Sequence, residues 1–100
     1  MNTKVEEMDD KFVATLEGEM DTAAALEVEA VLKPLYESKG KDIFIDCSKL
    51  EYIASSGLRI LVGILKGAKA DGSRVVLQGV NEEIKSVFAL TGMISLFEFE

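Results

Sequence analysis

Apolar and polar residues alternate over residues 12–17, which predicts a half-buried strand with Phe12, Ala14 and Leu16 on one face. A weaker apolar pattern over residues 4–8 predicts a second strand just before it. Asp9 and Asp10, with Lys11, have the composition of a turn. We therefore expect the two strands to form an antiparallel hairpin.

Apolar residues recur at helical spacing over residues 23–38, which predicts a helix. Either Asp21 or Thr22 is a suitable N-cap for it. We expect the apolar face of this helix to contain Leu26, Ala30, Val31, Leu32 and Leu35. Pro34 lies inside the pattern, where it removes a backbone donor and disfavours helical geometry at the residue before it. The sequence therefore predicts a kinked helix or two abutting helical pieces.

Strand and helix patterns alternate through the rest of the chain. The short apolar runs 43–45 and 75–77 predict buried strands. Residues 57–70 predict a helix with Leu58, Leu61, Val62 and Leu65 on its apolar face. A third helix, capped by Asn81 and ended by Gly92, carries Ile84, Val87, Phe88 and Leu90, and a final apolar segment covers residues 96–99.

A hairpin followed by alternating helices and strands predicts an α/β fold. The crossovers favour a mixed, largely parallel sheet of about four to five strands with helices packed against it. A chain of 100 residues is long enough for one hydrophobic core. We expect one domain that spans residues 1–100.

The net charge of −7 changes the picture of possible partners, because such a surface repels phosphate backbones and anionic headgroups. We expect no nucleic-acid partner and no membrane association. The basic residues Arg59, Lys66 and Lys69 follow one polar stripe, which favours a solvated helix face. The apolar runs are too short to span a membrane, and the charged first ten residues do not form a signal peptide, so we expect a cytoplasmic location.

The chain offers little for catalysis or metal binding. It contains one cysteine and no histidine, which excludes an internal disulfide and the common zinc sites. No nucleophile with a neighbouring base and no Gly-rich phosphate loop is visible. We expect no catalytic residues, no cofactor and no small-molecule substrate, and we expect Cys47 to pack as a small apolar residue.

The segment 45–61 carries the most specific chemistry. It is predicted to run from a buried strand through a loop into a helix that begins near Ser55 and Ser56. The first turn of a helix leaves its backbone N–H groups without internal partners, so a phosphate added to a serine there is tolerated. The alternative interpretation is structural, because serine is also a favoured N-cap.

Three segments together resemble the STAS family, which is named for sulphate transporters and anti-sigma-factor antagonists. Residues 18–21, Gly-Glu-Met-Asp, are similar to the family's pattern after its second strand. Residues 45–48 and 52–58 are similar to its strand-to-helix signature. Residues 90–93, followed by Phe97, are similar to its C-terminal pattern. The resemblance covers nearly the whole chain.

The resemblance implies a binding module switched by phosphorylation of Ser55 or, less readily, of Ser56. The unphosphorylated form would bind an anti-sigma factor with serine-kinase activity and so release a sigma factor, and a phosphatase would reverse the modification. The implied partner-binding residues are Asp21, Asp46, Ser56, Gly57, Leu58 and Arg59, and the resemblance places the two aspartates near the serine loop. Capping and turn formation are the alternative roles of these aspartates.

Two residues depart from the family pattern. Ala54 stands where antagonists commonly carry an aspartate directly before the phosphorylated serine, and Arg59 replaces a frequent small residue in the first turn of the helix. The alanine keeps a second interpretation open, in which the chain is a STAS scaffold or regulatory subunit that is never phosphorylated. The arginine offers a guanidinium that would pair with a nearby phosphate.

Overall fold

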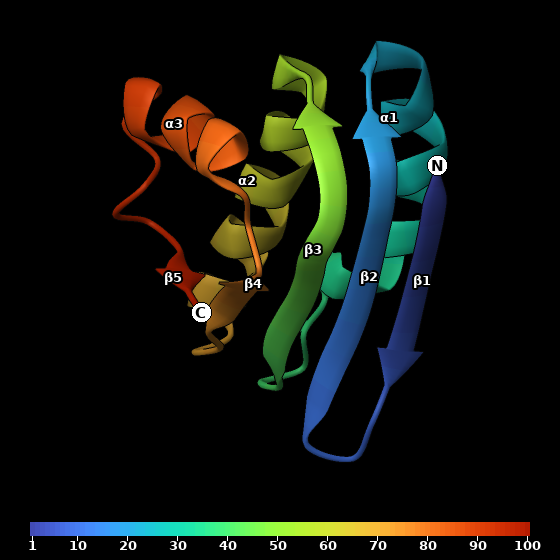
Figure 1. The fold of residues 1–100 in the computed structure, drawn as a ribbon. Helices are drawn as coiled ribbons and strands as arrows, with labels where there is room; N and C mark the ends of the chain where they lie inside the picture. The colour runs from blue at the N-terminus through green and yellow to red at the C-terminus, as the bar shows by residue number, and fades with distance from the viewer.

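The computed structural model describes residues 1–100 and contains one sheet whose strand order follows the sequence (Figure 1). The strands are β1 (Asn2–Glu7), β2 (Lys11–Met20), β3 (Asp42–Ile53), β4 (Val75–Gln78) and β5 (Glu98–Phe99). β1 and β2 form the antiparallel hairpin, and the other three neighbouring pairs are parallel. The predicted α/β fold with a mixed, largely parallel sheet is therefore confirmed.

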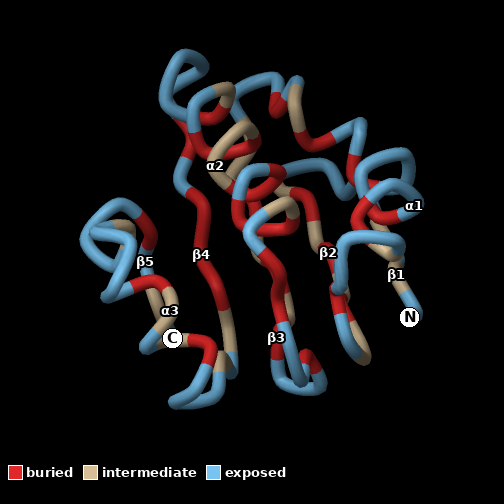
Figure 2. The backbone as a smooth tube through the Cα atoms, turned by 90° about the horizontal axis from the view of Figure 1, so that it is seen from above, coloured by how far each residue is buried: buried red, intermediate tan, exposed pale blue.

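The helical segments are α1 (Thr22–Leu32), the 3-10 helix η1 (Lys33–Tyr36), α2 (Ser55–Ala70) and α3 (Glu82–Leu90). Figure 2 shows α1 and α2 together on one side of the strands. The inward-facing residues of β2, which are Phe12, Ala14 and Leu16, are buried against this helical layer together with Ile43 and Ile45 of β3. The alternation in the sequence thus predicted the buried face of β2 correctly.

Pro34 ends α1 as predicted, because the chain passes at Lys33 into η1 with the proline in its first turn. Of the predicted apolar face, Leu32 and Leu35 are buried as expected, but Leu26, Ala30 and Val31 are exposed. Ala25, Val28 and Leu32 face the core, whereas 76% of Leu26 is exposed. The small side chain of Ala25 lets the helix approach the sheet, and the larger Leu26 lies about 100° away around the helix.

A similar correction applies to the end of α3, where 88% of Leu90 is exposed. Ile84 and Phe88 are one turn apart and form the buried stripe of this short helix. Leu90 follows two positions later and therefore points away from that stripe.

Two strands are longer than their apolar patterns indicated. β2 continues through Gly18 to Met20, and β3 continues through Asp46 to Ile53, where a loop was expected. The register between them shifts after Thr15 and again after Gly18, whose φ is +106°. Such bulges interrupt the two-residue period of a strand. The C-terminal parts of β2 and β3 therefore show no recognisable alternation of apolar and polar residues.

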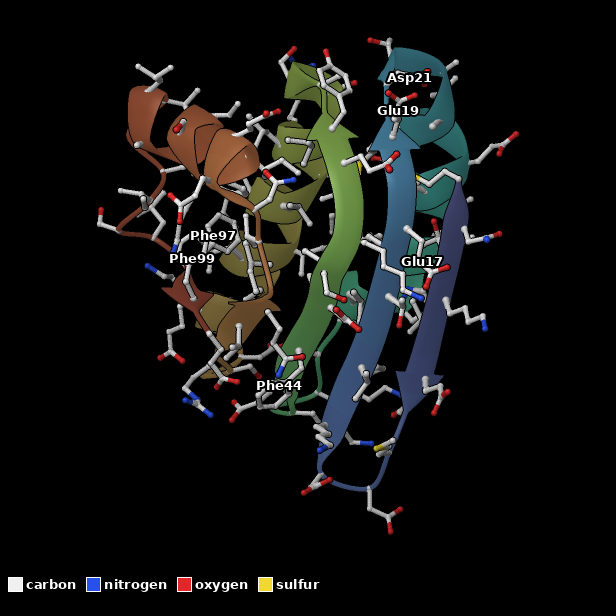
Figure 3. The ribbon with its side chains drawn as sticks, in the orientation of Figure 1. Glu17, Glu19, Asp21, Phe44, Phe97 and Phe99 are labelled. Atoms are coloured by element: carbon white, nitrogen blue, oxygen red, sulfur yellow. The ribbon has the colours of Figure 1, made fainter.

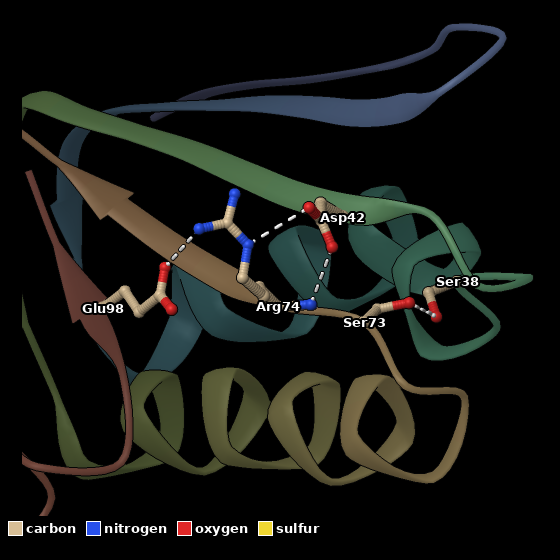
Figure 4. A network of polar contacts seen from close by, with 5 residues as sticks. All are labelled: Ser38, Asp42, Ser73, Arg74 and Glu98. Carbon is tan, nitrogen blue, oxygen red and sulfur yellow. Dashed lines mark hydrogen bonds and ion pairs between the residues drawn. The ribbon is translucent and has the colours of Figure 1, made fainter.

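Polar contacts at the end of the sheet where β3, β4 and β5 begin connect the loops and the C-terminal strand (Figure 4). Arg74 contacts Asp42 through its Nε atom at 3.2 Å and Glu98 through its Nη1 atom at 3.0 Å. A hydrogen bond from the backbone of Arg74, followed by its side chain, lowers the pKa of Asp42. The buried Ser38 and Ser73 share a hydrogen bond of 2.9 Å between their hydroxyls. These groups join β3, β4 and β5.

Candidate functional site

All three α-helices follow strands that end at the same edge of the sheet. β2 leads through Asp21 into α1, β3 leads through Ala54 into α2, and β4 leads through a short loop into α3 (Figure 1). We call this the carboxyl edge. Helix N-termini carry partial positive charge and free N–H groups, so the carboxyl edge favours anionic groups.

The ends of β2 and β3 bring Asp21 close to Ser55. Met20 pairs with Ile53, and the Ala54 N–H donates a hydrogen bond of 2.8 Å to the Met20 carbonyl oxygen. Asp21 therefore lies beside Ala54, with Ser55 next in the chain. The Asp21 carboxylate accepts a 2.8 Å bond from the Ala24 N–H, which confirms its predicted capping role. Figure 3 shows Asp21 at the tip of β2 with Glu19 nearby.

Ser55 is the exposed first residue of α2, and Ala54 is the N-cap. The backbone bonds of the first turn begin with Gly57 and Leu58, whose N–H groups both donate to the Ala54 carbonyl oxygen. Neither serine hydroxyl caps the helix. The structural interpretation of these serines as N-caps is therefore wrong, and the position of Ser55 requires no hydroxyl for folding.

Ser56 is half-buried, and its hydroxyl oxygen is buried without a hydrogen-bond partner. It lies in a groove of about 290 Å³ between α1 and α2, which is also lined by Thr22, Leu26 and Arg59. Arg59 is exposed, lies one helical turn after Ser55 and takes part in none of the ion pairs of the structure. The guanidinium is thus free to interact with an added anion.

Gly57 and Leu58 lie beneath this surface. Only 4% of Leu58 is exposed, and a Cβ atom on Gly57 would lie 2.6 Å from Met20 Sδ and 2.9 Å from Ile53 Cγ1. The glycine lets the start of α2 pack directly on β2 and β3. Their buried positions support the edge from below, and the contact of these two residues with a partner stays a prediction.

Asp46 is not near the serine, and this expectation is also wrong. It lies within β3, in register with Thr15 and Gln78. Ile53 lies seven positions further along the strand, which corresponds to roughly 23 Å at about 3.3 Å per residue. A hydrogen bond from Ser48 lowers its pKa, and the Ser48 N–H lies 2.9 Å from Asp46 Oδ1. This bond lies inside the strand, where the register between β2 and β3 shifts, so the turn-forming alternative is not confirmed either.

Three exposed residues at the carboxyl edge were missed by the sequence analysis. Glu19 and Tyr52 pair across β2 and β3, and 50% of Tyr52 is exposed. Leu26 reaches the groove beside Ser56 from α1. Glu19 and Tyr52 both belong to the segments that resemble the family. Their place beside the serine could be recognised only once β2 and β3 were known to extend that far.

Cys47 is the single thiol of the chain and lies buried in β3. Burial, with a smaller contribution from Asp46, raises the pKa of the Cys47 thiol to about 12, so it packs as the predicted apolar residue. No three His, Cys, Asp or Glu side chains gather in a way that would hold a metal ion. None of the helices has the length and apolar character needed to cross a membrane.

The fold and the carboxyl edge together define an α/β module that presents an accessible serine at a helix start beside an aspartate. The chain belongs to the STAS family, since the model of the STAS domain matches residues 2–100.

Among curated proteins, the anti-sigma-B factor antagonist of Staphylococcus epidermidis is 31% identical over 98 residues, which cover 96% of this chain and 91% of that protein. The Staphylococcus aureus protein of the same name is 28% identical, with 96% and 89% covered. Among solved structures, a putative anti-sigma factor antagonist from Thermotoga maritima matches with a TM-score of 0.78 and 26% identity, over 97% of this chain and 84% of that one.

Proposed function

We propose that this chain is an anti-sigma-factor antagonist, a protein-binding module whose unphosphorylated form binds an anti-sigma factor and thereby releases a sigma factor. Relatives with that name are similar along almost their whole length, at up to 31% identity. The proposal includes no catalytic residue, cofactor or small-molecule substrate. The cytoplasmic location stays a prediction.

Ser55 is the proposed phosphorylation site, and the observation that carries this assignment is its exposed position at the start of α2 without a capping role. Phosphate would add a charge of about −1.5 to −2 beside free N–H groups, so α2 would tolerate it. A partner docked on this spot would instead meet a new dianion and lose a hydroxyl donor. Ser56 is less suitable because its hydroxyl is buried.

The proposed docking surface consists of the exposed residues around Ser55 at the carboxyl edge. Asp21, Glu19 and Tyr52 come from the ends of β2 and β3, and Arg59 comes from the first turns of α2. An anti-sigma factor that is itself a serine kinase would bind this surface and phosphorylate Ser55. A phosphatase would then restore the binding-competent form.

Ala54 supports a second candidate function, a STAS scaffold that is never phosphorylated. The residue is buried and its methyl group offers no hydrogen bond to orient the Ser55 hydroxyl. An aspartate at this N-cap would contact the helix N–H groups directly. The two functions therefore differ in whether a kinase can use Ser55 without that neighbour.

The deciding experiment incubates the protein with ATP and the anti-sigma factor kinase encoded in the same genome, followed by mass-spectrometric mapping of the phosphate. We expect one phosphate on Ser55, none on Ser55→Ala, and normal labelling of the matched control Ser56→Ala. Binding to the kinase should persist in Ser55→Ala and weaken in Ser55→Asp. Binding of the unmodified protein without any labelling would favour the scaffold function, and equal binding of all variants would exclude the switch.

A further inference from the structure

β1 leaves one edge of the sheet open, because it pairs with β2 alone (Figure 1). The Met8 N–H donates a 2.8 Å bond to the Lys11 carbonyl oxygen, and these residues continue the register of the hairpin. Hydrogen-bonded residues alternate in an antiparallel pair, so the even-numbered residues of β1 bond to β2. The backbone groups of Thr3, Val5 and Glu7 therefore point outward.

The side chains of β1 carry a self-complementary charge pattern. Lys4 and Glu6 are both exposed, occupy one face of the strand and join none of the ion pairs within the chain. Val5 is half-buried between them on the other face. Read in the reverse direction, the sequence Lys-Val-Glu places each charge opposite its complement.

We propose that two copies of this chain pair through β1, antiparallel about a two-fold axis at Val5, to form one continuous sheet. In this register Val5 lies opposite Val5 of the second copy, and Lys4 lies opposite Glu6 of the second copy on both sides of the axis. The outward N–H and C=O groups of Thr3 and Glu7 then face each other, so the hydrogen bonds match the charges.

Neighbouring registers lack this agreement. An axis at Lys4 places the two lysines opposite each other, and an axis at Glu6 does the same to the two glutamates. Like charges directly opposite in a sheet are destabilising. Only the axis at Val5 satisfies both charges of each copy and keeps five residues of each strand, 3–7, in the pair.

The helical layer also fits this pairing. α1 packs against both β1 and β2, and the axis keeps both copies of α1 on the same face of the sheet. With strands about 4.8 Å apart, the two copies of α1 would lie about 10 Å apart, which is a normal helix packing distance. Val31, which is 40% exposed, lies on the flank of α1 opposite Leu26 and Glu29, which line the groove beside α2, and so faces this contact.

Antiparallel pairing would direct the two carboxyl edges to opposite ends of the extended sheet. Each copy would keep its Ser55 exposed, since β1 and α2 lie on different parts of the fold. The dimer would thus be bivalent, while dimerisation itself does not depend on phosphorylation.

The test measures sedimentation equilibrium of the full chain from micromolar to millimolar concentrations, with two single variants, Lys4→Glu and Glu6→Lys. Each variant turns both ion pairs of the dimer into like-charge pairs, so we expect the dissociation constant to rise about tenfold or more. An equimolar mixture of the two variants restores opposite charges and should form a heterodimer. The double variant K4E/E6K should dimerise like the original chain.

The matched control is Lys66→Glu, which changes the net charge as Lys4→Glu does but alters an exposed, unpaired lysine on α2. It should leave the dissociation constant within about twofold of the original. A chain that stays monomeric at millimolar concentration overturns the proposal. So does a dimer whose dissociation constant Lys4→Glu and Glu6→Lys leave unchanged, or a mixture of the two that forms no heterodimer.

Discussion

Tyr36 lies directly against the backbone of Gly67, where an added Cβ atom would be only 2.7 Å from the Tyr36 carbonyl oxygen. One turn earlier, a Cβ atom on Gly63 would lie 2.8 Å from Cε1 of the Tyr36 ring. Glycines cost helix stability, so their presence on one face of α2 requires a reason. The reason is the close packing of η1 on α2.

We predict that Gly67→Ala destabilises the protein by about 1–3 kcal/mol, because a backbone carbonyl cannot move away from the new methyl group. Gly63→Ala is the matched control. The flexible Tyr36 ring can shift there, and the helix gains about 1 kcal/mol of propensity, so its effect should stay within about 1 kcal/mol. Urea denaturation measures both changes. A stabilised Gly67→Ala would contradict the tight contact.

The sequence predicted the architecture because the buried residues of most strands and helices recur at the spacing typical of those elements. The alternation around Ala14 and the apolar run at Ile45 mark two adjacent strands, and Pro34 marks the end of α1. These signals depend on local sterics and on burial against one helical layer, which act in every α/β fold. The largely parallel sheet followed from the alternation of strands and helices, whereas the strand order came from the structure.

The site was predicted less completely, because its geometry depends on where the strands end. The family resemblance placed Asp46 near the serine, and the bulges between β2 and β3 hid the continued strand in which Asp46 lies. For the same reason Tyr52 was not recognised as an exposed neighbour of Ser55. The assignment of Ser55 itself came from the family resemblance rather than from spacing.

We predict that Ala54→Ser stabilises the protein by about 1 kcal/mol, because Ala54 occupies an N-cap with no side-chain bond to the helix. Its backbone already has the extended conformation of a cap, as at Asp21 and Asn81. At Ala54 φ is −81° and ψ is 165°, so a serine there needs no backbone change. Thermal and urea denaturation measure the gain, and a variant no more stable than the original chain would contradict the empty cap.

Phosphorylation of Ser55 should stabilise α2, and Arg59 should contribute to that effect. The two residues are four positions apart, with the anion nearer the helix N-terminus, which is the favourable orientation for an ion pair on a helix. We predict that phosphorylation raises the free energy of unfolding by about 0.5–1 kcal/mol and that Arg59→Gln removes about half of this gain. The measurement compares phosphorylated and unphosphorylated forms of both chains. Lys66→Gln, further along α2, is the control and should leave the gain unchanged.

Cys47 should make stability depend on alkaline pH. Its pKa is raised to about 12 in the folded protein by burial, whereas an unfolded thiol titrates near its ordinary value of about 8.5. Between these values the unfolded chain loses the proton and the folded chain keeps it, so the free energy of unfolding falls as pH rises. The expected slope is about −1.4 kcal/mol per pH unit.

Urea denaturation of the original chain and of Cys47→Ala at pH 8–10.5, a range of roughly two and a half units around the ordinary thiol pKa, isolates this slope. The lysines and tyrosines titrate in both proteins, so their contributions cancel in the difference. The difference in unfolding free energy should stay constant below the ordinary thiol pKa and shrink above it, because only the original chain loses stability there. Parallel curves over the whole range would show that the thiol ionises in the folded protein as readily as in the unfolded chain, which its burial in β3 does not allow.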